Sequence, residues 1–140
     1  MQPANSPRID WTLFLIRAVP ALLLLVFHGW GKLSGAVGYL LQGQEWNFVG
    51  GVAKMGFPFP AVFAVCAALA ESVAAFTLGL GFLTRFSAAI VSFNMLVAMY
   101  YHISTRTAFD SAAMYLLCAA VFLFVPPGRF SVDHVLRARK

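Results

Sequence analysis

Long stretches of the chain are almost free of charged residues. They cover residues 10–31, 59–81, 84–103 and 110–126, and away from their ends only Arg17 and Glu71 interrupt them. The apolar runs are solid, as in residues 21–26, and lack the alternation of a membrane-spanning strand. A bilayer core of about 30 Å needs about 20 helical residues, and a helix satisfies its own backbone hydrogen bonds in lipid. The pattern predicts an all-α integral membrane four-helix bundle forming a single domain over residues 1–140.

The connections between these stretches fit this architecture. Gly81 begins a tight link between the second and third helices, and Pro126 and Pro127 end the fourth, because proline cannot continue a helix. The one long connection, residues 33–58, is predicted to hold a short interfacial helix near residues 45–55. The side of that helix expected to face lipid carries Trp46, Val49, Val52 and Ala53.

Composition excludes several classes of protein. The chain is 61% hydrophobic and 11% charged, with a mean hydropathy of +0.80, whereas soluble domains are about 45–50% apolar and about 25% charged. A disordered chain, a disulfide scaffold and an ordinary water-soluble domain are therefore excluded. The net charge is +5, but basic residues gather only at Arg137, Arg139 and Lys140. Without a contiguous basic stripe, no nucleic-acid partner is expected; the partner is the lipid bilayer.

The basic residues also predict how the chain is oriented. With four spans, both termini and the second loop lie on one side, and that side holds six basic residues against three on the other. The six are Arg8, Arg85, Arg129, Arg137, Arg139 and Lys140, and the three are Lys32, Lys54 and Arg106. Since basic loops remain in the cytoplasm, we expect a multi-pass protein with both termini cytoplasmic.

Polar residues inside the apolar stretches form the first candidate cluster. Arg17, Glu71 and Asn94 lie at similar depths in the first, second and third spans. A charge in the bilayer costs about 2.5–3.5 kcal/mol on insertion scales and usually has a partner. We therefore predict an Arg17–Glu71 ion pair supported by Asn94. Two interpretations stay open: a structural clamp that sets helix register, and a proton-relay or ligand-anchoring pair.

A second polar layer lies toward the opposite ends of the first and third spans. Arg17, His28 and Lys32 share a helical face by their spacing, and Tyr101 and His102 end the third span. His28, Lys32, Tyr101 and His102 are therefore candidate ligand-binding residues. The histidines could be interfacial residues with water and backbone partners, donors to a quinone, or, as a less favoured alternative, haem ligands. No metal-binding motif is present, and no metal site is predicted.

Two further features have structural interpretations. Cys66 and Cys118 fall inside predicted helices, where thiols are usually inert packing residues. Small residues recur every fourth position in the second span, as in Ala64, Ala68 and Ser72. This spacing lets helices approach closely, and it favours packing within the bundle over formation of a homo-oligomer.

Several short motifs resemble the DoxX family of small four-helix bacterial membrane proteins. They follow one another in the family's order over residues 10–134, nearly the whole chain. They are Arg17, HGWGKL at 28–33, MGFPFP at 55–60, Glu71, LGLGFLTR at 78–85 and PGRFSVD at 127–133.

The resemblance implies a component of the bacterial inner membrane linked to quinone-dependent or other redox complexes. We therefore expect a quinone-associated subunit or accessory component of a membrane oxidoreductase system, with partner subunits. Whether such a component is itself an enzyme stays open, as does its cofactor, for which quinone is the main candidate. A non-catalytic membrane anchor or assembly partner is the alternative, and a small-molecule permease is a weaker one.

Overall fold

The computed structural model describes residues 6–139, and every regular element in that range is helical. Most elements are α-helices, and two labelled η are single π-helical turns inside longer helices. In chain order they are α1 (Pro7–Leu24), η1 (Leu25–Gly29), α2 (Trp30–Gln42), α3 (Asn47–Lys54), α4 (Pro60–Leu69), η2 (Ala70–Ala74), α5 (Ala75–Leu80), α6 (Thr84–Ser104), α7 (Asp110–Phe124) and α8 (Val132–Ala138). The all-α prediction is confirmed.

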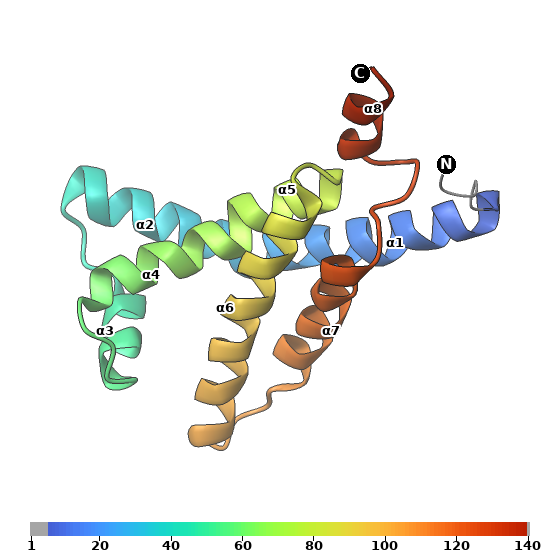
Figure 1. The fold of residues 1–140 in the computed structure, drawn as a ribbon. Helices are drawn as coiled ribbons and strands as arrows, with labels where there is room; N and C mark the ends of the chain where they lie inside the picture. Colours follow the sequence, from blue (N-terminus) through green and yellow to red (C-terminus); the bar gives the residue numbers. More distant parts are fainter. Residues whose placement is uncertain (1–5, 140) are drawn as a thin grey trace.

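Two long helices form the centre of the molecule (Figure 1). The segments α1, η1 and α2 are one continuous helix, and α4, η2 and α5 run antiparallel along it. Helices α6 and α7 lie side by side and cross this pair, and they bury the apolar core together with α1 and α5. The short helix α3 lies at one end of the molecule, and α8 projects from the other end near the N-terminus.

The length and surface of these helices are those of a multi-pass membrane protein. Three helices, Pro7–Gln42, Pro60–Leu80 and Thr84–Ser104, are long and apolar enough to span a bilayer, and Asp110–Phe124 is a shorter apolar helix. Large apolar side chains point outward: Phe27 is 72% exposed and Leu117 70%. Arg17 and Glu71 are instead only 1% and 3% exposed. This inverted distribution suits lipid, since polar groups in a membrane face the interior of the bundle.

The first span is longer than the sequence predicted. Its helix continues past residue 31 to Gln42, and its 36 residues reach about 54 Å at 1.5 Å per residue. The predicted loop therefore begins only at Gly43, whose left-handed backbone (φ 65°) ends the helix. Two glycines in this added length are contact points: Gly35 packs on the Trp46 side chain and Gly38 on that of Gln44.

The predicted interfacial helix exists as α3, but its orientation differs from the prediction. Val52 was expected to face lipid, yet it is 3% exposed and packs inside the molecule, where α3 contacts α4. Trp46, just before α3, is half-buried against Gly35. The side of this short helix that carries Val52 therefore packs against the bundle, whereas Ala53 is exposed.

Several segments distant in the sequence meet at the end of the molecule that carries α8. Gly81 (φ 71°) turns the chain between α5 and α6. Asp133 of α8 accepts hydrogen bonds from the backbone N–H groups of Leu83 (2.9 Å) and Thr84 (2.8 Å), and from the Thr84 hydroxyl (2.7 Å). Asp133 thus caps α6, and it satisfies N–H groups that a helix start leaves without intrahelical partners.

The Asp133 cap makes stability depend on pH. Burial alone raises the pKa of Asp133, but the hydrogen bonds from Thr84 and Leu83 outweigh it and hold the pKa below its usual value. Because the folded-state pKa is lowered, the stabilisation is complete above about pH 4–5 and is lost as pH falls through the folded-state pKa. We expect the stability difference between wild type and Asp133→Asn in detergent to shrink below about pH 4. Asp110→Asn, at an exposed position, should show no such convergence.

Candidate functional site

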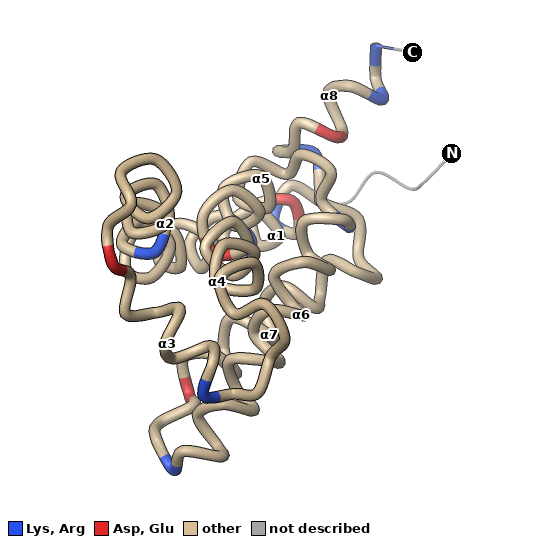
Figure 2. The backbone as a smooth tube through the Cα atoms, turned by 90° about the vertical axis from the view of Figure 1, so that its left-hand side faces the viewer, with Lys and Arg blue, Asp and Glu red and all other residues tan. Residues whose placement is uncertain are grey.

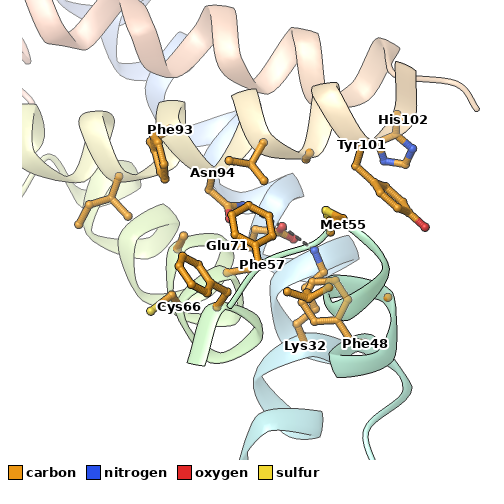
Figure 3. A pocket seen from close by; sticks show the side chains of 18 of the residues that line it. Lys32, Phe48, Met55, Phe57, Cys66, Glu71, Phe93, Asn94, Tyr101 and His102 are labelled. Atoms are coloured by element: carbon orange, nitrogen blue, oxygen red, sulfur yellow. Dashed lines mark hydrogen bonds and ion pairs between the residues drawn. The ribbon is translucent and has the colours of Figure 1, made fainter. Parts of the chain in front are cut away.

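A pocket of about 620 Å³ lies between α3, α4, η2 and α6. Its wall is mostly apolar, with the aromatic rings of Phe48, Phe57 and Phe93 around it (Figure 3). The volume falls in the range of about 300–1,000 Å³ that small-molecule sites occupy. After α2 the chain returns through α3, which packs on α4. Helices α3 and α4 and the loop between them thus face α6 across the pocket.

The polar groups of this pocket converge on Glu71, a buried residue of η2. Lys32 Nζ lies 2.5 Å from Glu71 Oε1, and Asn94 Nδ2 donates a hydrogen bond to the same oxygen at 3.0 Å. Lys32 Nζ also lies 4.7 Å from the centre of the Phe48 ring, a cation–π distance. Figure 3 shows this ion pair between the helices that carry its two residues. The Lys32 ammonium thus balances the charge of the Glu71 carboxylate, and the neutral Asn94 amide adds a hydrogen bond.

Tyr101 and His102, from the last turns of α6, line the same pocket. Figure 3 shows that Tyr101 and His102 lie farther along the pocket wall and do not contact Lys32 or Glu71. His102 Nδ1 lies 2.8 Å from the Thr107 hydroxyl oxygen, which fixes its ring. The structure therefore brings together Lys32, Tyr101 and His102 of the candidate ligand residues, together with Glu71 and Asn94 of the candidate polar cluster.

The predicted Arg17–Glu71 ion pair is wrong. Arg17 donates hydrogen bonds to three backbone carbonyls instead: those of Gly79 (3.3 Å), Phe130 (2.6 Å) and Pro127. In the antiparallel pair of long helices, Arg17 lies opposite Gly79, eight residues beyond Glu71, which is about 12 Å along the helix. Its role is to join α1 and α5 to the turn before α8.

His28 lies outside the pocket, contrary to its predicted place on the face shared by Arg17 and Lys32. The π-helical turn η1 adds one residue to a helical turn, so that Trp30 donates its N–H to Leu25 rather than to residue 26. This rotates the following residues, and Gly29 becomes buried while His28 is exposed. The His28 ring packs edge-on against that of Tyr115, with centroids 5.9 Å apart. His28 and His102 therefore occupy separate places.

Gly29 and Gly31 flank Trp30, and the sequence predicts that they permit close approach of a ligand or a neighbouring helix. Gly29 does so, because it lies against the backbone of Glu71 on the other long helix. A Cβ atom on Gly29 would overlap the backbone carbonyl of Glu71. The two π-helical turns, η1 and η2, contact each other there. Such turns occur frequently at functional sites. Only a residue without a side chain permits this contact at Gly29, whereas a Cβ atom at Gly31, the other glycine of the HGWGKL motif, would meet no atom within 4 Å.

The remaining candidate residues take the following places. Cys66 is exposed on α4 and lines the pocket, so it is not the buried packing residue expected, whereas Cys118 is half-buried. Ala64, Ala68 and Ser72 are fully buried, in agreement with packing within the bundle. Within residues 6–139 no group of three His, Cys, Asp or Glu side chains is placed to hold a metal ion.

Comparison with known proteins adds one finding. The model of the DoxX family matches residues 12–104, a range that contains every residue lining the pocket. No curated protein and no solved structure matches the chain.

Proposed function

Since the chain belongs to the DoxX family, we propose that its pocket binds a membrane quinone and that the protein is a quinone-associated component of a membrane oxidoreductase system. The observation that carries this proposal is the division of the pocket into an apolar wall and a few convergent polar groups. Such a division suits an amphipathic ligand with a polar head and an apolar tail.

The polar residues of the pocket fit a quinone head group. Its carbonyl oxygens only accept hydrogen bonds, so the site must supply donors. The Lys32 ammonium has three N–H donors and the Asn94 amide has two, and each uses one on Glu71. The remaining donors, with those of Tyr101 and His102, would hold the head group. Phe48, Phe57 and Phe93 would contact its ring or tail.

A bound quinone would supply two-electron chemistry coupled to two protons, and the chain's own residues would manage the protons. Glu71 is the only carboxylate lining the pocket within the described range 6–139, and Lys32 and Asn94 stabilise its charged form. Tyr101 and His102 lie toward the end of α6, where they could exchange protons with water. Glu71 would take up the proton at Oε2, the oxygen that Lys32 and Asn94 do not engage, and Lys32 would offset the charge when that proton leaves.

Binding of a short-chain ubiquinone to the purified protein tests the proposal. Trp46 contacts the Phe48 ring, with centroids 5.4 Å apart, so we expect its fluorescence to be quenched saturably as quinone is added. Lys32→Met should weaken binding about 10–100-fold, because a hydrogen bond from a charged group contributes about 1.5–3 kcal/mol. Lys54→Met, outside the pocket, is the matched control.

Tyr101→Phe provides a second test in case the Lys32 variant does not fold, since it removes only a hydroxyl group. It should weaken quinone binding several-fold at unchanged thermal stability. A lipid extract of the purified protein should also contain quinone. Absence of saturable quenching together with a quinone-free extract would overturn the proposal in favour of the non-catalytic anchor or assembly partner.

We further propose that the protein lies in the bacterial inner membrane with both termini in the cytoplasm. Lys32 was counted with the outer loops, but it is paired with Glu71 inside the molecule. The basic residues then divide six to two, since only Lys54 and Arg106 remain at the end opposite the termini. This asymmetry is typical of cytoplasmic termini. A thiol placed at Arg139 should resist a membrane-impermeant reagent in intact cells, and one at Lys54 should react.

A further inference from the structure

The end of the molecule that carries α8 has an excess of positive charge. Five arginines lie exposed there, on α1, on α6, and on and beside α8: Arg8, Arg85, Arg129, Arg137 and Arg139. Figure 2 shows basic positions along α8, which projects from the rest of the chain. Lys140 lies outside the described residues.

The two acidic residues at this end form no ion pair with these arginines, although the charge of Arg137 helps to lower the pKa of Asp133. Asp10 accepts a hydrogen bond from the backbone N–H of Arg129 (3.1 Å), and Asp133 is occupied by Leu83 and Thr84. The one ion pair within residues 6–139 is Lys32–Glu71, elsewhere in the molecule. The exposed guanidinium groups therefore have no carboxylate at ion-pair distance in the described chain, and they remain available to an external anion.

Helix α8 also has an unsatisfied apolar side. No residue of α8 is buried, and Val132, Val135 and Leu136 are 37%, 48% and 46% exposed. At about 100° per residue these three side chains fall within an arc of about 80–100°. Phe130, just before α8, is 46% exposed and extends this apolar surface toward the bundle. A soluble anion could neutralise the arginines, but it would leave these side chains in water.

The start of α8 is held firmly, so its orientation is defined. Ser131 caps α8 by accepting a hydrogen bond from the His134 N–H (3.2 Å), and Arg17 holds the Phe130 carbonyl. Asp133 ties the first turn to α6. In Figure 1, α8 projects beyond the bundle, running across the direction of α1 and roughly along that of α6. Since no residue of α8 is buried, the whole helix is accessible to a surface at this end of the molecule.

We propose that α8 and its arginines bind the surface of an anionic phospholipid leaflet. Val132, Val135 and Leu136 enter the boundary between head groups and acyl chains, and Arg129 and Arg139 bind lipid phosphates. Amphipathic helices with basic residues bind membranes in this way, and guanidinium groups match phosphate geometry. The proposal concerns a surface separate from the pocket, so it does not depend on quinone binding.

Hydrogen exchange of the whole protein in lipid nanodiscs tests this proposal. The exchange of backbone amides 132–138 is compared between nanodiscs of phosphatidylcholine alone and of phosphatidylcholine mixed with phosphatidylglycerol. Each arginine at an anionic surface contributes about fivefold, so two predict slowing by up to about 25-fold in the mixed lipid at low salt. The effect should fall to a few-fold at about 1 M salt, where the Debye length is about 3 Å.

Matched variants separate the alternatives. Replacing Arg129 and Arg139 by glutamine should abolish the dependence on anionic lipid, while Lys54→Gln with Arg106→Gln, at the opposite end, should keep it. Leu136→Ser should reduce protection in both lipids. Equal protection in the two lipids would overturn the proposal. Protection restored in phosphatidylcholine by inorganic phosphate or by RNA would also overturn it, and would assign the surface to a soluble anion.

Discussion

Replacing Arg17 by glutamine is expected to lower the free energy of unfolding in detergent by about 3–5 kcal/mol. The guanidinium is 1% exposed and donates to the carbonyls of Gly79, Pro127 and Phe130. A hydrogen bond to a charged group contributes about 1.5–3 kcal/mol, and carbonyls left without a donor add a desolvation cost. Arg17→Lys should recover less than half of the loss, because an ammonium group lacks the planar fork that reaches several acceptors.

The matched control is Arg85→Gln, at an exposed position on α6 at the same end of the molecule, which should change stability by less than about 0.5 kcal/mol. Unfolding followed by circular dichroism measures both variants. Hydrogen exchange of residues 127–131 should also rise in Arg17→Gln, since their anchor is lost. An Arg17→Gln protein as stable as wild type would show that these three contacts do not hold the C-terminal turn.

Replacing Gly29 by alanine is expected to destabilise the bundle by about 3 kcal/mol, at the upper end of the cost of overpacking. The new methyl group would overlap the backbone carbonyl of Glu71. The overlap cannot be relieved by a small rearrangement, because the obstructing atom belongs to a helix backbone and not to a flexible side chain. The two long helices must separate, and this displaces Glu71 relative to Lys32.

Gly31→Ala provides a control two residues away. A Cβ atom at Gly31 meets no atom within 4 Å, and alanine is favoured over glycine in a helix by about 1 kcal/mol. The same chemical change should therefore have opposite effects at the two positions, as measured by unfolding in detergent. Equal effects would mean that Gly29 does not mark a close helix contact.

The spans could be predicted from sequence because lipid imposes a length and an apolar composition on each of them. The second, third and fourth helices begin and end within two residues of their predicted bounds. The extension of the first helix to Gln42 could not be predicted in this way, because its last turns are held by contacts of Gly35 with Trp46 and of Gly38 with Gln44. The apolar composition of a span does not indicate such contacts.

The candidate site was predicted in part, for a physical reason. Lys32, Glu71, Asn94, Tyr101 and His102 were singled out as polar residues in an apolar setting, and all line one pocket. Their partners could not be assigned by depth alone.

Arg17 shows why depth was not enough to assign a partner. It satisfies its hydrogen bonds with backbone carbonyls, and every residue type has a carbonyl, so no sequence pattern distinguishes these acceptors.

The turn at Leu25–Gly29 amounts to the insertion of a single amino acid into an otherwise regular helix. Deleting one residue there would restore the ordinary hydrogen-bond ladder, but it would turn everything on one side of the deletion by about 100° relative to the other. Arg17 and Lys32 could then no longer both reach their partners. The extra residue therefore lets one continuous helix direct both Arg17 and Lys32 toward their separate partners.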